Sequence, residues 1–417
     1  MFPPDGGNST GKGAVPKLSQ SRVDGFWLLL GLSFLAIWPF PVGPDGAPVS
    51  LSLYDLFLPL VFLFAAARGW VSWPGRTTVL LFLTPVLLIV LHSVAMVAFA
   101  SGVHLPSLAF GTLKTAAFFL DIGMLALLLQ GAGRRPSLGL LLFLVFGASV
   151  QALGMQYLEV HITQWVTYET IYAATITGLL LLLFASAEMR QKPMNFLKTL
   201  VLSAWAFAVV FLLYAKIFTL VAFLLVALFL LLQFRRLEPG RRRWLAVGVG
   251  AFAALAAFFV FALIDIKLGL GRVSIYTMPW QEIQKSFDLR LELWTPAWRF
   301  AVESFPWGIG VNQFGPALQR AANAQALVIG GGNVHNVPLQ LLTELGALGI
   351  GIGGALLALV GFAARRFDGY RRAMLGVYIL LPMLLHGVLG LRVFHVVLAY
   401  GLARTLAAAA KRKTPDI

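Results

Sequence analysis

The sequence predicts an all-α polytopic membrane protein with about twelve transmembrane helices and one large helical loop late in the chain. Hydrophobic residues make up 59% of the chain and charged residues 12%, a composition outside the range of soluble domains. Repeated apolar runs approach the roughly 20 residues that a helix needs to cross a bilayer, and the alternating pattern of barrel strands is not found. The chain has no cysteine, which excludes disulfides, thiol nucleophiles and cysteine-based metal sites.

The apolar runs divide the chain into five parts. Residues 1–24 are rich in Gly, Pro and Ser and predict a disordered cytoplasmic tail; no basic stretch with a cleavage site frames the first apolar run, so we expect no signal peptide. Residues 25–265 hold nine spans, residues 266–338 a loop, residues 339–408 three further spans and residues 409–417 a second cytoplasmic tail. The twelve predicted spans are residues 25–40, 53–68, 77–99, 109–130, 137–157, 170–187, 197–213, 217–233, 244–265, 339–363, 373–389 and 391–408.

The positions of Lys and Arg predict the orientation. With the N-terminus in the cytoplasm, 23 of the 32 Lys and Arg residues fall in cytoplasmic segments, as the inside-positive bias of membrane proteins requires. The net charge of +15 is therefore a topology signal, and nucleic-acid binding gains no support from it. The nine remaining cations are Lys114, Lys216, Lys267, Arg272, Lys285, Arg290, Arg299, Arg320 and Arg392.

The long loop on the predicted outer side is expected to fold as a cap on the membrane surface. Connections of this length in compact proteins are usually functional or disordered. This one carries four tryptophans among its charges, and the stretch QEIQKSFDLRLELWTPAWRFAVESF has the pattern of an amphipathic helix. Arg290 and Trp294 are four positions apart in it and hence share a face. Arg290 is either a solvated charge or a functional one, and Trp294 either anchors the cap at the interface or stacks on a sugar.

Three cations at or near the outer ends of spans need a reason, because charge in hydrocarbon is costly. Lys216 occupies a short turn between two spans and Arg392 follows a tight hairpin; each either snorkels to the headgroups or binds a ligand. Lys114 lies deeper, with Asp121 seven positions later on the same helix face and roughly 10 Å away. That separation is too large for a direct pair, which leaves a salt bridge through another helix and ligand binding both open.

Polar residues gather in GGNVHNVPLQLLTELGALG, where the cap returns to the membrane. Pro338 suits the first turn of a helix, and Asn336, Gln340 and Glu344 are spaced to form a polar stripe along it. His335 stands at the top of this stripe. A neutral imidazole near pH 7 can accept a proton and so suits a general base, although a capping or hydrogen-bonded structural role also fits.

The order of motifs across residues 290–349 resembles the O-antigen ligase and polymerase family. The motifs are R-x-x-x-W at Arg290 to Trp294, P-x-G-x-G-x-x-x-F at Pro306 to Phe314, and H-N-x-x-L-Q-x-x-x-E-x-G-x-x-G at His335 to Gly349. The twelve-span layout with one large outer loop is similar to that family as well. Two positions depart from its pattern: Lys216 stands where an arginine is common, which loses the bidentate fork, and Leu289 stands where a small residue is expected.

The resemblance implies a metal-independent, inverting membrane glycosyltransferase of the GT-C type in the bacterial inner membrane, with a periplasmic active site. Its donor would be a glycan on undecaprenyl diphosphate and its acceptor lipid A-core, with membrane lipids around it. It implies no cofactor, and the sequence has neither an Asp-x-Asp motif nor a His cluster for a metal. The implied catalytic residues are His335 as base with Arg290 and Lys216 at the diphosphate, and the implied substrate-binding residues are Asn336, Gln340, Glu344, Lys114, Arg392 and Trp294.

Ligation onto lipid A-core and polymerisation of carrier-linked repeat units differ only in the acceptor. The clean H-N-x-x-L-Q pattern and the single cap favour the ligase, with the polymerase as the alternative. A protein O-glycosyltransferase is disfavoured, because those relatives usually carry a further C-terminal soluble domain. A transporter is disfavoured too, because its essential ionisable residues should lie near the midplane on broken helices, whereas this constellation lies at the outer surface.

Overall fold

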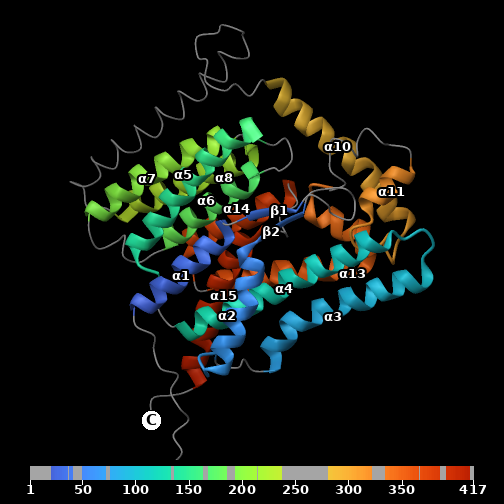
Figure 1. Cartoon of the computed structure of the whole chain (residues 1–417), viewed down its shortest axis with the longest axis horizontal. Helices are drawn as coiled ribbons and strands as arrows, with labels where there is room; N and C mark the ends of the chain where they lie inside the picture. The colour runs from blue at the N-terminus through green and yellow to red at the C-terminus, as the bar shows by residue number, and fades with distance from the viewer. Residues whose placement is uncertain are drawn as a thin grey trace, which may run out of the picture.

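The computed structural model shows a bundle of helices with one short hairpin (Figure 1). Thirteen helices fall within the part of the chain that it describes. Helices are expected here because only they and closed barrels satisfy every backbone polar group in lipid. The described residues are 20–35, 37–40, 49–71, 76–132, 136–162, 168–185, 193–213, 215–236, 280–321, 334–365, 367–385 and 391–413.

The helices follow the apolar runs of the sequence. Eleven of the twelve predicted spans coincide with a helix, and the predicted span 244–265 lies outside the described residues. The helices of the bundle are α1 (Gln20–Leu35), α2 (Leu53–Ala67), α3 (Arg76–Phe99), α4 (Leu105–Ala132), α5 (Leu138–Ile162), α6 (Tyr168–Ala185), α7 (Pro193–Leu212), α8 (Lys216–Arg236), α13 (Val337–Ala364), α14 (Gly369–Leu385) and α15 (Arg392–Lys413).

The first predicted span is too long at its C-terminal end. Residues 37–40 are not helical but form strand β1 (Ile37–Phe40), which pairs antiparallel with β2 (Val49–Ser52). Pro39 explains the difference, because proline lacks the N–H that a helix interior needs and is tolerated in a short edge strand. The hairpin then leads directly into α2.

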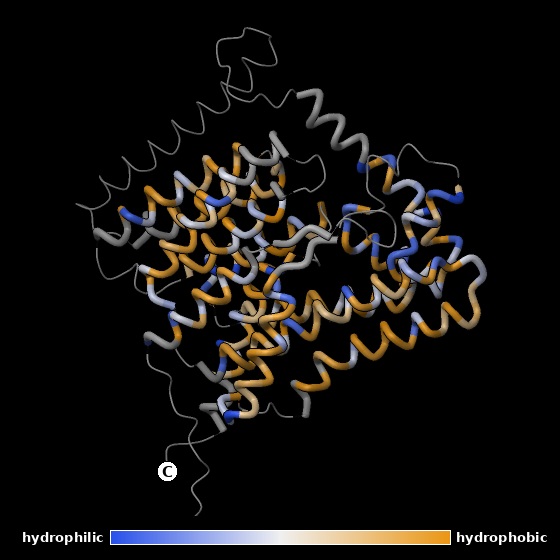
Figure 2. The backbone as a smooth tube through the Cα atoms, in the orientation of Figure 1, coloured by the Kyte–Doolittle hydropathy of each residue, from blue (hydrophilic) through white to orange (hydrophobic). Residues whose placement is uncertain are grey.

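Apolar surface on the bundle fits a multi-pass membrane protein. Among the described residues, three helices are long and apolar enough to cross a bilayer, at Phe82–Phe99, Leu105–Gln130 and Val337–Ala364, and six more hold shorter apolar segments. Helix α3 is apolar along nearly its whole length (Figure 2), and large aliphatic side chains such as Leu87 and Val94 are exposed on it. Such a surface is expected of a helix that faces lipid.

Helix α15 occupies the centre of the bundle. It packs against α4, α13 and α6, and nearly every side chain from Leu391 to Ala403 is buried. Helices α5, α6, α7 and α8 form a group on one side of it, whereas α3, α4 and α13 lie together on the other side (Figure 1). A helix buried on all sides must be apolar all round, which explains why the run VFHVVLAYGLA of α15 lacks a charged face.

The described part of the predicted cap holds the helices α10 (Trp280–Glu303) and α11 (Phe314–Arg320). They lie at one end of α4 and α13 and are more polar than the bundle (Figures 1 and 2). The inner face of α10 buries Leu293, Ala297 and Ala301, which follow one another at intervals of four residues as an amphipathic helix requires. The predicted amphipathic helix is therefore present.

Candidate functional site

Helix α13 is broken at Gly346. That residue has φ 57° and ψ −128°, a conformation in which only glycine is unstrained. The break is sharp: residues 341 and 349 of a straight helix would be about 12 Å apart, yet a Cβ added to Gly349 would collide with the carbonyl of Leu341. The predicted continuous span over residues 339–363 is thus two helical segments, and the glycines of the E-x-G-x-x-G pattern form the bend.

The loop after α10 donates hydrogen bonds to carbonyls that the break in α13 exposes. Two carbonyls before the bend, those of Thr343 and Glu344, have lost their helical donors. The backbone N–H of Ile309 donates to the Thr343 oxygen at 3.0 Å, and that of Gly310 donates to the Glu344 oxygen at 2.9 Å. The loop therefore supplies the hydrogen bonds that the break removed, as buried backbone groups demand.

Two glycines make this close approach possible. Gly308 has φ 75°, and a Cβ at this position would lie 2.5 Å from the Glu344 oxygen. A Cβ at Gly346 would collide with the carbonyl of Pro306, which accepts a hydrogen bond of 2.8 Å from the N–H of Ala347. The P-x-G-x-G motif and the glycine of α13 are thus two halves of one contact, which we call the loop–helix lock (residues 306–310 with 343–347).

The same loop is fixed to α3 and α4 on its other side. The Gln313 side chain, 0% exposed, accepts from the N–H of His104 at 2.8 Å and donates to the carbonyl of that residue at 3.0 Å. Nε2–H of His92 donates to the Trp307 carbonyl at 2.7 Å. His92 lies seven residues before the end of α3, so the loop reaches about 10 Å along that helix. Irregular backbone is tolerated at such a level only where protein groups satisfy it.

Glu344 belongs to this loop contact. The residue is 5% exposed; its carboxylate accepts a hydrogen bond from the Gln340 side chain at 3.3 Å, and the backbone N–H groups of Asn312 and Phe314 favour its charged form. A carboxylate with several donors is a satisfied group. The polar stripe predicted from Gln340 and Glu344 therefore faces the loop that follows α10.

His335 sits in a short turn just before α13. Its φ is 54°, in the left-handed region that is uncommon for residues other than glycine. Asn336 is the N-cap of α13: its side-chain oxygen accepts from the N–H of Leu339 at 2.9 Å. A proline occupies the first turn of the helix as predicted. His335, the predicted base, is half-buried and lies directly before the N-cap residue of α13.

Helix α10 docks on this turn. Nε1–H of Trp294 donates to the carbonyl of Val334, the residue before His335, at 3.0 Å. Arg290 lies on the same face of α10, about 6 Å along the axis from Trp294, and is half-buried. Burial lowers the pKa of Arg290 from its ordinary value, but a guanidinium stays charged at neutral pH. The first sequence motif therefore contacts the residue that directly precedes the third motif.

The predicted cations outside this region are placed on other elements. Lys216 is the first residue of α8, and its side chain lies outside the described set. Lys114 is exposed on α4, and it interacts electrostatically with Arg392 and Glu344. Among described residues, no carboxylate lies within ion-pair distance of Lys114.

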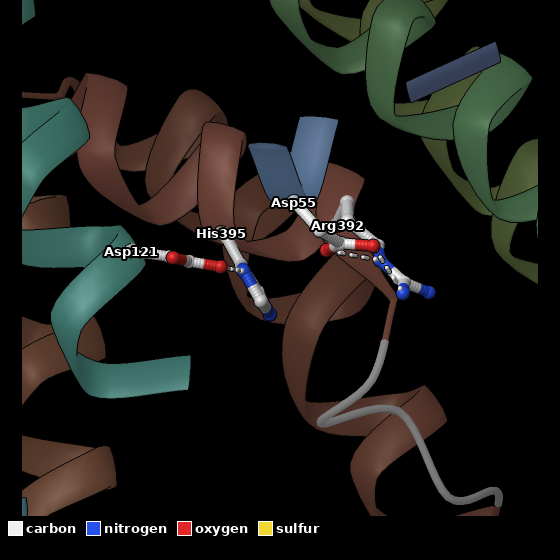
Figure 3. Close-up of polar contacts among 4 residues, drawn as sticks. All are labelled: Asp55, Asp121, Arg392 and His395. Carbon is white, nitrogen blue, oxygen red and sulfur yellow. Dashed lines mark hydrogen bonds and ion pairs between the residues drawn. The ribbon is translucent and has the colours of Figure 1, made fainter. Parts of the chain in front are cut away.

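Arg392 begins α15 and forms a bidentate ion pair with Asp55 in the first turn of α2 (Figure 3). Its Nε donates to one carboxylate oxygen at 3.2 Å and a terminal nitrogen donates to the other at 2.9 Å. Both side chains are less than a quarter exposed. The planar fork of arginine matches a carboxylate in this geometry, so Arg392 has a protein partner besides the ligand that the sequence analysis considered.

Asp121 also has a partner on another helix. Its carboxylate accepts from Nδ1–H of His395 on α15 at 3.1 Å (Figure 3), and the rings of Phe118 and Tyr54 pack edge-on against the imidazole. Asp121 therefore has a hydrogen-bonded partner on another helix, whereas the two options for Lys114 both stay open. The sequence analysis missed Asp55 and His395 because it weighed cations alone, although any ionisable residue in a membrane helix is a signal.

Comparison with known proteins gives one family. The family model described as O-Antigen ligase matches residues 199–352, a range that holds Lys216, the α10 motif, the loop–helix lock and His335. None of the curated proteins matches the chain. The resemblance found in the sequence is confirmed by this match. Residues 199–352, a little over a third of the chain, are therefore similar to the O-antigen ligase family.

Proposed function

We propose that this protein is an O-antigen ligase, which transfers a glycan from undecaprenyl diphosphate to a sugar hydroxyl of lipid A-core at the periplasmic face of the inner membrane. The observation that carries the proposal is the docking of α10 on the turn before α13. The helix that bears Arg290 and Trp294 contacts the turn that bears His335, and both lie inside the region matched by the family. This contact joins the helix that carries the proposed cation to the turn that carries the proposed base.

In this proposal His335 acts as the general base. A sugar hydroxyl is a weak nucleophile at neutral pH, so proton removal during bond formation accelerates attack. The acceptor oxygen bonds to the anomeric carbon of the donor while the bond from that carbon to the diphosphate oxygen breaks. The electron pair leaves with the diphosphate, the hydroxyl proton passes to the imidazole, and a single displacement inverts the anomeric centre.

Fixed cations stabilise the leaving diphosphate. Negative charge grows on it as the bond breaks, and preorganised positive groups in a partly dry site act most strongly on such charge. Arg290 and Lys216 take this role. Lys114 is an exposed cation on an apolar helix, electrostatically coupled to Arg392, and the two extend the positive region toward the second phosphate.

Asn336, Gln340 and Glu344 act through the backbone in this proposal. Asn336 caps the helix that follows His335, while Gln340 and Glu344 hold the loop that closes the break. Their predicted contacts with sugar hydroxyls thereby become indirect. Substitution of any of these three residues is expected to alter the backbone around His335 or in the adjoining loop, rather than to remove a direct contact with a sugar.

The test is a transfer assay with purified protein and no added metal. A polyprenyl diphosphate-linked glycan is offered together with lipid A-core or with a second carrier-linked glycan, and the products are sized. Glycan on lipid A-core supports the ligase. Lengthened carrier-linked glycan identifies the polymerase instead, and no transfer to either acceptor refutes both.

Variants locate the chemistry. His335→Ala and Arg290→Ala abolish transfer while expression and folding are kept, whereas Arg299→Ala on the exposed side of α10, where Arg299 pairs with Glu303 at 3.1 Å, retains it. Turnover at the wild-type rate in either of the first two variants refutes the role given to that residue. Lys216→Arg keeps substantial activity and Lys216→Ala does not; equal activity in both assigns Lys216 to the headgroups.

A further inference from the structure

The turn that carries His335 is held from outside by a tryptophan. Val334, 0% exposed, belongs to a buried apolar cluster with Leu293, Ala297, Phe314 and Leu318. Its carbonyl accepts the indole N–H of Trp294 at 3.0 Å. The peptide that precedes His335 is therefore fixed both by packing and by a directional hydrogen bond.

The peptide on the other side of His335 is fixed as well. The Asn336 side chain accepts from Leu339, and the Asn336 carbonyl accepts from the N–H of Gln340 at 2.8 Å. Between these two anchors His335 adopts φ 54°. A left-handed residue other than glycine persists only where its surroundings hold it, so the direction in which the imidazole leaves the backbone depends on those anchors.

We propose that Trp294 is a positioning residue for His335, whose indole N–H holds the Val334 carbonyl and so aims the imidazole. The inference rests on the proposed function, in which His335 is the base, and assigns to Trp294 a role other than sugar stacking. Two observations favour it over stacking. The polar edge of the indole is occupied by backbone, and the ring is half-buried against the apolar cluster, whereas Trp298 on the same helix is 59% exposed.

The expected effect follows from the geometry. Removing the donor frees the turn to relax, and displacement of a catalytic group by about 1 Å costs on the order of 100-fold in rate. In this role Trp294 does not contact the substrates, so their KM values are expected to stay near those of the wild type. A loss confined to kcat is the signature of a base that is present but badly aimed.

Two substitutions at one position separate the roles. Trp294→Phe keeps an aromatic face and removes the N–H, while Trp294→Leu removes both. Positioning predicts that both variants lose roughly 10- to 100-fold in kcat with little change in KM, in the transfer assay with polyprenyl diphosphate-linked glycan and lipid A-core. Stacking predicts that Trp294→Phe behaves as wild type and Trp294→Leu raises KM, and this result overturns the proposal.

Controls remove the remaining explanations. Trp298→Phe, four residues away and exposed, keeps wild-type kcat. Thermal unfolding is measured for each variant, and a lower midpoint with unchanged kcat per folded molecule assigns Trp294 a merely structural role and overturns the proposal. Wild-type kcat in Trp294→Phe overturns it too.

The double variant distinguishes this proposal from the proposed function. If Trp294 acts through His335, adding Trp294→Phe to His335→Ala has no further effect on the trace of transfer that remains without the base. An additional loss of the same size as in the single variant overturns the positioning role. Full activity of His335→Ala alone refutes the base assignment, whereas inactive His335→Ala with fully active Trp294→Phe refutes only the role of Trp294.

Discussion

Substitution of Gly346 by alanine tests the loop–helix lock most directly. The added Cβ would collide with the Pro306 carbonyl, which already accepts the N–H of Ala347. The φ and ψ of 57° and −128° also belong to a region that alanine avoids. Either the backbone at residue 346 changes conformation or the loop moves away from α13, and each response breaks hydrogen bonds between the two.

The expected cost applies to a Gly346→Ala variant in which the alanine keeps the strained backbone conformation and the loop moves away from α13. Holding alanine in a glycine-only region costs about 1–3 kcal/mol. Moving the loop leaves buried groups unsatisfied at about 1–3 kcal/mol each, and the lock contains three such bonds, from Ile309, Gly310 and Ala347. With one bond lost, the total is about 2–6 kcal/mol, a large part of the stability of a typical folded domain.

Thermal unfolding of the purified protein in detergent measures the effect. Gly346→Ala lowers the midpoint by on the order of 10 °C, at roughly 2–4 °C per kcal/mol. The control is Gly351→Ala in the same helix, where an added Cβ meets nothing within 4 Å; it leaves the midpoint unchanged or raises it, because alanine favours helix. Equal midpoints for the two variants refute the lock.

Three further predictions concern buried polar contacts, each measured by the same unfolding assay. Gln313→Ala removes both hydrogen bonds that this buried side chain makes with the backbone of His104 and costs about 1–3 kcal/mol; an unchanged midpoint contradicts the anchoring of the loop. Asp55→Ala removes the ion pair with Arg392 and costs about 1–3 kcal/mol. The exchange of Asp55 and Arg392 restores part of that loss, and no recovery rules out an ion pair as the cause. Tyr378→Phe removes a buried bond of 3.0 Å to a carbonyl of α6 and costs about 1 kcal/mol; a gain in stability would contradict that bond.

Periodicity predicted the helices but not their interruptions. The bounds of α2 and α3 agree with the apolar runs to within a residue, because a spanning helix must be apolar along its length. The hairpin after α1 was missed although Pro39 lies inside it, since a short apolar strand and a helix end share the same composition. The break at Gly346 was missed because its partner loop lies some 40 residues upstream, and no local pattern records such a contact.

In the candidate site, too, single residues were predicted from the sequence but their contacts with distant residues were not. His335 and Arg290 were predicted from the chemistry of single residues and the order of motifs; the structure brings together the turn and the helix that carry them, and their roles stay predictions. Asp55 and His395 were not found, because their meaning depends on Arg392 and Asp121 on other helices. Ionisable residues that are costly in lipid can be recognised in the sequence, whereas their pairing is seen only in the fold.

The loop–helix lock also constrains how the length of this chain can change. One residue added between Pro306 and Gly310 would shift the N–H groups of Ile309 and Gly310 out of line with the carbonyls of Thr343 and Glu344, and one removed near Gly346 would do the same from the other side. The two halves of the lock are separated in the sequence by residues 311–342. Insertions and deletions are therefore expected to accumulate between the two halves of the lock and to be excluded from within either half.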